Sequence, residues 1–152
     1  MSYGVLSTEQ TIKSGVPQGS VLGPWCYLVY SNDMPNCVTS CKMIMYADDT
    51  ILLACDRNLQ VVSDTLSIGI SKCYHWLTNN NLSMHMGKTE AIVISSKRKQ
   101  HLTSNFSVTC QSHTVTAKNQ LKYLGICIDN TLSGENIVKS IVSKCSSRLS
   151  FL

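Results

Sequence analysis

Two adjacent carboxylates are the residues with the clearest chemistry in this chain. They belong to the tetrapeptide Tyr46-Ala47-Asp48-Asp49, which lies between the apolar runs 43–45 and 51–54. Two short apolar runs around such a break predict a β-hairpin, although Asp-Asp is not one of the strong turn dipeptides. The turn would hold both carboxylates in the open, where they repel each other, and a divalent cation would relieve that repulsion. A solvated turn without a ligand is the alternative, because Asp is common in turns.

A second unusual stretch, residues 14–24, contains three glycines and two prolines in eleven residues. This composition indicates a backbone in special conformations, with several amides free to face a ligand. Ser20 is a candidate cap for a helix that runs to about Tyr30, and Pro24 fits the first turn of that helix. The stretch would therefore bring amides and the Gln18 side chain to a helix start, a place that favours anions.

Together the two segments closely resemble the palm of a reverse transcriptase, and most closely that of the non-LTR retrotransposon (LINE-like) branch. The resemblance implies that Asp48 and Asp49 are catalytic and hold metal, with two Mg²⁺ (or Mn²⁺) ions in the complete site. It places Tyr46 with the residues that contact the nucleotide and the template, which by motif are Gly15, Pro17, Gln18, Gly19 and Ser20. The implied partners are an RNA template, a DNA primer and a dNTP.

Lys88 lies in the segment Met86-Gly87-Lys88-Thr89, ahead of an expected strand at 91–94. A phosphate-binding P-loop is excluded, because its first glycine would fall on Leu82 and a helix would have to follow. The family carries a Lys-Thr pair here, so the resemblance implies that Lys88 neutralises or protonates the departing pyrophosphate. The family usually has Asn three residues before that lysine, where this chain has His85.

The remaining periodicity predicts an α+β fold. An apolar stripe predicts a helix over 57–78 that is capped by Asp56 or Asn58 and ended by three asparagines, 79–81. Ser133 is a candidate cap for a last helix with a stripe of Ile137, Ile141, Cys145 and Leu149. Strands are expected as a pair within 3–13 and at 82–84, 106–110, 113–117 and 121–128.

The resemblance orders these elements as a partial polymerase palm over residues 1–130 and the start of a thumb helix over 131–152. An antiparallel sheet would carry the catalytic hairpin, and the helices at about 20–32 and 57–78 would back it. Within the strand expected at 121–128, Tyr123, Leu124 and Gly125 match the family's primer grip.

The composition suits one globular domain, with 152 residues of which 43% are hydrophobic. Residues 1–85 carry four basic and six acidic side chains, whereas residues 86–152 carry nine basic and three acidic. A negative part that collects metal and a positive part that faces phosphate suit a polymerase. The eight cysteines form no zinc pattern, so buried thiols are expected. No signal peptide or membrane span is apparent, so an intracellular protein with no membrane partner is expected.

The family's third metal-holding aspartate lies on a strand before the glycine-rich stretch, but only thirteen residues precede Ser14, and Glu9 is their one acid. The fingers, which hold the template and the triphosphate, also have no counterpart here. We therefore expect a truncated transposon copy or a partial gene model that does not polymerise alone. We also expect a bare sheet edge and poor solubility. The alternatives are a non-catalytic transposon-derived module that binds nucleic acid or a partner, and an unrelated metal-dependent phosphohydrolase, which would leave the glycine-rich stretch unexplained.

Overall fold

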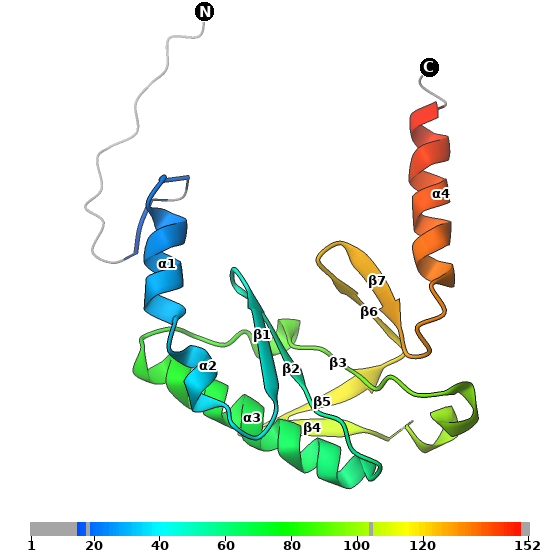
Figure 1. Ribbon diagram of the computed structural model, residues 1–152, viewed down its shortest axis with the longest axis horizontal. Helices are drawn as coiled ribbons and strands as arrows, with labels where there is room; N and C mark the ends of the chain where they lie inside the picture. The colour runs from blue at the N-terminus through cyan, green and yellow to red at the C-terminus, as the bar shows by residue number, and fades with distance from the viewer. Residues whose placement is uncertain (1–14, 18, 104, 150–152) are drawn as a thin grey trace, which may run out of the picture. The chain divides into compact units, whose positions relative to one another are not determined.

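The computed structural model describes residues 15–17, 19–103 and 105–149 (Figure 1). The chain divides into two compact units, residues 1–33 and 34–152. The strand pair expected within residues 3–13 lies outside the described residues, and so does Gln18.

In the first unit, a turn leads into helix α1 (Gly23–Ser31). The Ser20 N–H donates to the Pro17 carbonyl at 3.1 Å, and Gly19 takes a positive φ of 85° at this turn. The Gly23 N–H then donates to Ser20 Oγ at 3.0 Å. The prediction that Ser20 is the cap is therefore wrong, because the helix begins three residues after it and Leu22 is the N-cap, without a side-chain cap bond. Ser20 Oγ still accepts from the first amide of the helix, which would otherwise lack a partner inside it. Pro24 lies in the first turn, as predicted.

The second unit mixes helices and strands, which confirms the α+β class. Its elements are, in order, α2 (Met34–Cys37), β1 (Lys42–Tyr46), β2 (Asp49–Leu53), α3 (Leu59–Asn79), the 3₁₀ helix η1 (Met86–Lys88), β3 (Ala91–Ile92), the 3₁₀ helix η2 (Lys97–Leu102), β4 (Ser107–Cys110), β5 (His113–Lys118), β6 (Gln120–Tyr123), β7 (Ile126–Asp129) and α4 (Glu135–Leu149). Among the described residues, no helix is both long enough and apolar enough to span a bilayer.

Helix α3 begins and ends where its local signals predict. The Asn58 side chain accepts a hydrogen bond from the Gln60 N–H, so Asn58 is the N-cap. At the other end Asn81 takes a φ of 54°, and the Leu82 N–H donates to the Leu77 carbonyl at 2.8 Å. This is a Schellman closure. The strand predicted at 82–84 is wrong, because the Leu82 amide closes the helix and the following residues run on irregularly into η1.

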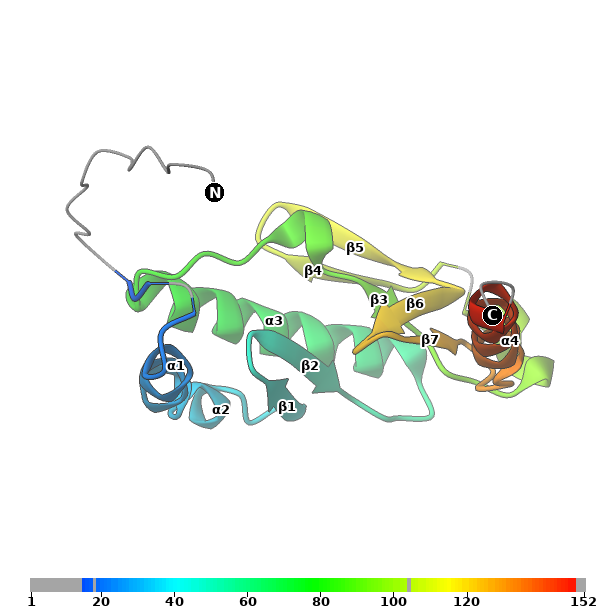
Figure 2. The same cartoon turned by 90° about the horizontal axis from the view of Figure 1, so that it is seen from above.

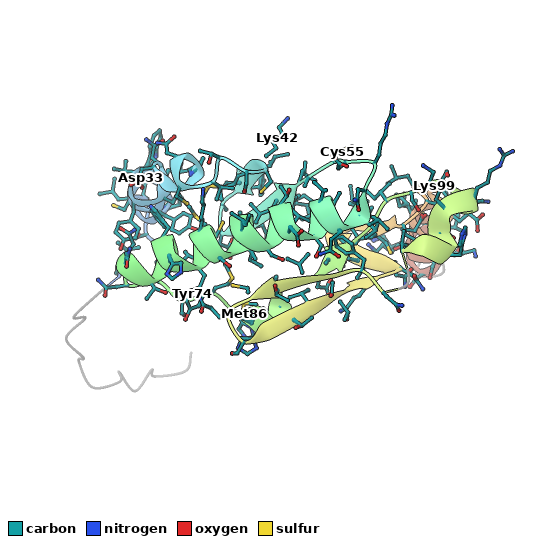
Figure 3. The ribbon with its side chains drawn as sticks, turned by 90° about the horizontal axis from the view of Figure 1, so that it is seen from below. Asp33, Lys42, Cys55, Tyr74, Met86 and Lys99 are labelled. Carbon is teal, nitrogen blue, oxygen red and sulfur yellow. The ribbon has the colours of Figure 1, made fainter. Side chains whose placement is uncertain are left out.

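The two faces of α3 pack against two different layers. The face toward β4 and β5 belongs to a cluster of buried residues, namely Ile70, Phe106, Val108 and Cys110. The face toward the β1–β2 hairpin and α2 belongs to a second cluster of Met34, Val38 and Cys73. Figure 2 shows the hairpin and the β4–β5 pair on opposite sides of α3. In Figure 3, Lys42 and Cys55 lie on the hairpin side, and Tyr74 and Met86 lie on the other.

Serine side chains on α3 hydrogen-bond to β4, which lies at the edge of its sheet. Ser63 Oγ donates to the carbonyl of Ser107. Ser67 Oγ accepts from the Thr109 N–H at 3.0 Å. Since edge strands leave backbone groups unpaired, these bonds satisfy groups that no neighbouring strand reaches.

The hairpin strands pair antiparallel, as predicted, but the described strands form three separate sheets, and one of these sheets contains a parallel pair. β1 pairs with β2, and β6 pairs with β7, both antiparallel. The third sheet has the order β3-β5-β4, and its β3 pairs parallel to β5. The strand expected at 121–128 is in fact the β6–β7 hairpin, which turns at Leu124 and Gly125. Strand pairing is set by contacts distant in sequence, which local periodicity does not encode.

None of the eight cysteines forms a disulfide, but they are not uniformly buried as expected. Cys73 and Cys110 are buried, whereas Cys26, Cys55 and Cys145 are exposed. Burial raises the pKa of the Cys73 thiol to about 12, and the nearby thiols of Cys37, Cys41 and Cys110 add to the effect. Cys73 is therefore an inert core thiol.

Candidate metal-binding site

The predicted hairpin is confirmed, and it turns in two residues. Tyr46 pairs with Asp49 at the end of the β1–β2 ladder, which leaves Ala47 and Asp48 as the turn. Ala47 takes a φ of 51°, whereas Asp48 is not among the residues with positive φ. Positive φ at the first turn position only is the pattern of a type II′ turn, which matches the twist of paired strands. Asp48 thus occupies the tip, and Asp49 begins the returning strand.

The base of the hairpin is packed closely onto α3. Met43, Met45 and Leu52 contact the buried cluster of Met34, Val38 and Cys73. Gly69 of α3 lies directly beneath: a Cβ at this position would be 2.6 Å from Cys41 Sγ. Since the inward face of the hairpin is held by this packing, the position of its tip follows from α3.

Both candidate metal ligands are exposed at the tip. Neither the Asp48 nor the Asp49 carboxylate has a hydrogen-bond or ion-pair partner in the described part of the chain. Two adjacent carboxylates without a counter-charge repel each other, and a bound cation removes that repulsion. Mg²⁺ is commonly held by one or two carboxylates, with water and substrate phosphate oxygens completing its octahedral shell. The donor set at the tip therefore fits this ion.

In the part of the chain that the structure describes, no third acidic, histidine or cysteine ligand joins these two carboxylates. Within residues 15–17, 19–103 and 105–149, no group of three or more such side chains is arranged to hold a metal ion. The hairpin therefore offers a partial ligand set, and other oxygen donors would have to complete it.

Tyr46 borders the carboxylates on the outer face of the hairpin. It is directly opposite Asp49 in the ladder and is 62% exposed. Directly opposite residues of an antiparallel pair point to the same face. A ligand held at the tip would therefore meet the Tyr46 ring on one side.

Lys88 ends η1 and is exposed, and a short strand follows it as predicted. Its backbone N–H donates to the His85 carbonyl at 3.0 Å, which closes the 3₁₀ turn. That strand, β3, covers only Ala91 and Ile92 rather than the predicted 91–94. No hydrogen bond or ion pair joins Lys88 to Asp48 or Asp49 among the described residues, so its role at the pyrophosphate stays a prediction.

The predicted primer-grip residues form the tip of the second hairpin. Tyr123 pairs with Ile126, and the two turn residues Leu124 and Gly125 take φ values of 46° and 82°. Positive φ at both positions is the pattern of a type I′ turn. In Figure 1 the tips of the β1–β2 and β6–β7 hairpins project to the same side of α3, as does α4. The grip itself stays a prediction.

The glycine-rich stretch belongs to the first unit. Gly15 and Gly19 take φ values of 81° and 85°, conformations that L side chains rarely adopt. Gly15, Pro17 and Gly19 are exposed, and Ser20 is half-buried. The backbone special conformations that the composition predicts are confirmed at these two glycines, whereas their contact with a nucleotide stays a prediction.

The sequence analysis missed Asp129, the most highly hydrogen-bonded carboxylate among the described residues. Its side chain is only 8% exposed and lies between β7 and α4. It accepts hydrogen bonds from the Thr131 N–H and Oγ1, the Ser133 N–H and Oγ, and the Gly134 N–H. These donors hold the pKa of the Asp129 carboxyl far below its usual range. The signal was available: an Asp followed by Thr and Ser at every second residue favours side-chain-to-backbone turns.

Comparisons with known proteins identify the family of the chain. Residues 2–128 match the family described as reverse transcriptase (RNA-dependent DNA polymerase). The chain is 28% identical over 153 residues to the RNA-directed DNA polymerase from mobile element jockey of Drosophila funebris, covering 96% of this chain and 16% of that protein. It is 27% identical over 151 residues to the probable RNA-directed DNA polymerase from transposon X-element of Drosophila melanogaster, covering 97% and 16%.

A third relative is the probable RNA-directed DNA polymerase from transposon BS of Drosophila melanogaster, 28% identical over 155 residues, with 94% of this chain and 16% of that protein covered. The chain thus spans about a sixth of the length of these relatives. No solved structure matches. The family match covers most of the chain, including the hairpin and the glycine-rich stretch, so the resemblance in the sequence is confirmed: the chain belongs to the reverse transcriptase family.

Proposed function

We propose that the tip of the β1–β2 hairpin is the divalent-cation binding site for RNA-directed DNA synthesis. One observation supports this most strongly. In a chain of the reverse transcriptase family, two adjacent exposed carboxylates without partners in the described residues lie at the tip of a hairpin that packing on α3 holds in place. An ordinary solvated turn requires neither this anchoring nor adjacent charges of the same sign.

Each residue of the site has a distinct part in this proposal. The Asp48 and Asp49 carboxylates hold divalent ions, which when bound activate the primer hydroxyl and stabilise the leaving oxygen. Tyr46 borders the nucleotide on the outer face. Lys88 supplies positive charge or a proton to the departing pyrophosphate.

Two further segments, the glycine-rich stretch and the turn between β6 and β7, position the nucleic acid and the nucleotide. Backbone amides of the glycine-rich stretch and the Gln18 side chain contact the nucleotide and the template. The turn at Tyr123, Leu124 and Gly125 holds the primer end. The nucleotidyl transfer itself requires little covalent chemistry from the protein, so positioning and charge account for most of these roles.

The isolated chain should bind cations weakly and fail to polymerise. In the described residues the hairpin contributes two carboxylates and no third ligand. Metal sites lose affinity and activity by orders of magnitude when a shared ligand is missing. We therefore assign this chain a part of the catalytic centre rather than the complete one.

A Mn²⁺-binding titration, followed by the paramagnetic broadening of water or protein resonances, tests the proposed cation-binding site. The wild-type chain should bind with a millimolar Kd, and Asp48→Asn should weaken binding at least about tenfold, because half of the side-chain charge is removed. Asp64→Asn is the matched control, since it removes an exposed carboxylate from α3. If both variants weakened Mn²⁺ binding equally, the attraction would be nonspecific and the proposed binding site at the hairpin tip would be rejected.

Primer extension on an RNA template with Mg²⁺ or Mn²⁺ tests the proposed inactivity. We expect no templated product from residues 1–152. Product that disappears in Asp48→Asn would overturn the inactivity and support the catalytic role of the hairpin. Product that persists in this variant would contradict that role.

The charge distribution favours a second candidate, a non-catalytic module that binds nucleic acid. Residues 86–152 carry nine basic and three acidic side chains. Binding that falls steeply with salt, without cation-dependent turnover, would support this candidate. Salt-independent binding would contradict it.

A further inference from the structure

The β1–β2 hairpin is attached to the rest of its unit by apolar contacts. Among the described residues, no hydrogen bond or ion pair joins residues 42–53 to another element. The polar bonds to α3 come instead from the loop before β1. There Ser40 Oγ donates to the Thr65 carbonyl at 3.4 Å, and Thr39 Oγ1 accepts from Lys72 Nζ at 3.3 Å. The hairpin itself therefore stays on α3 only as long as its inward face is apolar.

The β4–β5 pair, on the opposite side of α3, is attached in a different way (Figure 2). Besides its apolar contacts, it accepts a hydrogen bond from Ser63 Oγ at the Ser107 carbonyl. It also donates one from the Thr109 N–H to Ser67 Oγ at 3.0 Å. A change that makes the apolar contacts polar should therefore release the hairpin from α3 before it releases the β4–β5 pair.

Two methionines form much of the inward face of the hairpin. Along β1, Met43 and Met45 alternate with exposed residues, and Leu52 lies directly opposite Met43 in the ladder. The cluster that these three side chains contact is itself rich in sulfur, and it contains Met34, Cys37, Cys41, Cys73 and Met84. Met43 and Met45 are only partly buried, so a small solute has access to them, whereas Met34 is 4% exposed.

The thiols beneath the hairpin are poor targets for an oxidant. Burial raises the pKa of the Cys41 thiol, and it raises that of Cys73 to about 12. Both thiols are therefore protonated at neutral pH, whereas the thiolate is the form that reacts. A methionine thioether has no proton to lose, so its oxidation to the sulfoxide does not depend on a pKa. The partly exposed methionines are thus the sulfur groups through which an oxidant acts on this contact.

We propose that Met43 and Met45 form an oxidation site, at which a hydroperoxide such as H₂O₂ converts the thioethers to sulfoxides and thereby releases the hairpin from α3. A sulfur lone pair attacks one peroxide oxygen, and the S–O bond forms as the O–O bond breaks. The leaving hydroxide takes up the proton left on the transferred oxygen and becomes water. Sulfur is oxidised by two electrons, and the peroxide is reduced by two. Methionine sulfoxide reductases reverse the change.

A sulfoxide oxygen at either methionine meets no strong hydrogen-bond donor beneath the hairpin. Both side chains pack against Met34, Val38 and Cys73, of which only the thiol donates, and weakly. The base of the hairpin also approaches α3 closely, since a Cβ at Gly69 would be 2.6 Å from Cys41 Sγ. A polar oxygen buried without a hydrogen bond is unfavourable, so the oxidised hairpin is more stable with its inward face in water.

Hydrogen–deuterium exchange of the whole chain, followed by mass spectrometry, tests the proposal. The chain is treated with H₂O₂ and then with dithiothreitol, which reverses the oxidation of thiols to disulfides but leaves sulfoxides. Amides of residues 42–53 should then exchange at least about tenfold faster, whereas those of residues 107–118 should stay within about twofold. Methionine sulfoxide reductases for both epimers should restore slow exchange.

Peptide mapping of the same samples locates the sulfoxides. Oxygen should be found on both Met43 and Met45. Sulfoxides at these two positions without faster exchange of the hairpin would overturn the proposal. It would equally be overturned if Met84 and Met86 were oxidised while Met43 and Met45 were not.

Two matched variants assign the effect to the hairpin methionines. M43L/M45L keeps the volume and the apolar character of the contact, so exchange of its hairpin should no longer respond to peroxide. The control M84L/M86L removes two partly buried methionines outside the hairpin and should respond as the wild type does. A response that persists in M43L/M45L, or that disappears in M84L/M86L, would place the sensitive sulfur elsewhere and overturn the proposal.

The release of the hairpin is independent of the proposed cation site, because exchange is measured in EDTA. A chain that binds no Mn²⁺ would contradict the proposed function but leave the oxidation site intact. The further effect on the Asp48–Asp49 tip rests on the proposed function. If the untreated chain binds Mn²⁺, the oxidised chain should bind it more weakly, and the reductases should restore binding.

Discussion

The tip of the β1–β2 hairpin and the junction between β7 and α4 place aspartates in opposite electrostatic situations. At the tip, Asp48 and Asp49 are exposed and adjacent, without partners in the described residues. At the junction, Asp129 is 8% exposed and accepts bonds from Thr131, Ser133 and Gly134. Both sites lie at strand ends, since Asp49 is the first residue of β2 and Asp129 is the last residue of β7.

The contrast separates a structural carboxylate from a candidate functional one. Asp129 has used its acceptor capacity on the chain itself, so it stabilises the start of α4 and has little left for a ligand. The tip carboxylates have all of their acceptor capacity available. An anchored element that ends in unsatisfied charge indicates a site whose missing partner comes from outside the chain.

The largest loss of stability should come from removing the Asp129 charge at the junction between β7 and α4. Asp129→Asn puts an amide nitrogen against the Thr131 and Ser133 donors, so at least one bond becomes a donor-to-donor contact. We expect the Tm to fall by about 5–10 °C. In contrast, Asp48→Asn should change the Tm by less than about 2 °C. Thermal unfolding monitored by circular dichroism measures both, and similar shifts would erase the distinction between the two sites.

The same contrast predicts a difference in pH dependence. Because folding lowers the pKa of Asp129, its contribution to stability is fully present above the unfolded value of about 3.9. That contribution is lost as the pH falls from there toward the lower folded value. Wild-type stability should therefore drop more steeply between pH 4 and 2 than that of Asp129→Asn. Every other side chain is the same in the two proteins, so the difference in Tm between them isolates Asp129. Parallel curves would show that this carboxyl is not stabilised by folding.

Features encoded by neighbouring residues could be predicted from the sequence. The hairpin around Asp48, the Asn58 cap of α3 and the role of Ser133 before α4 each depend on a few consecutive positions. Ser133 Oγ accepts from the Glu135 N–H at 3.2 Å, as expected of a capping side chain. Such signals are short-range and survive in any tertiary context.

Features that depend on distant contacts could not be predicted. The separation into three sheets and the parallel β3–β5 pair follow from which strands meet in space. The β6–β7 turn was hidden because Leu124 adopts a φ of 46° inside what looks like one apolar strand. The contact between Gly69 and Cys41 likewise joins positions that are far apart in the chain.

Substitution of Gly69 tests how firmly the β1–β2 hairpin is packed on α3, in comparison with the junction between β7 and α4. Gly69→Ala gains about 1 kcal/mol of helix propensity but places a Cβ 2.6 Å from Cys41 Sγ. We expect a net loss of about 1–2 kcal/mol in the free energy of unfolding, because either α3 or the hairpin must shift. Urea denaturation measures it. The double variant C41A/G69A should recover most of the loss, and a failure to recover would place the strain elsewhere.

The smallest effect concerns the turn that presents the tip carboxylates. Ala47 adopts a φ of 51°, a conformation that costs a non-glycine residue about 1–2 kcal/mol, of which the greater freedom of unfolded glycine offsets about 0.5–1. Ala47→Gly should therefore stabilise the chain by about 0.5–1 kcal/mol in urea denaturation. Leu124→Gly is the matched control in the second hairpin, where φ is 46°. Only Ala47→Gly should also weaken Mn²⁺ binding, since a looser turn holds Asp48 and Asp49 less firmly. Gains in stability without that loss would mean that the strained turn contributes nothing to holding the carboxylates, and that the packing on α3 suffices.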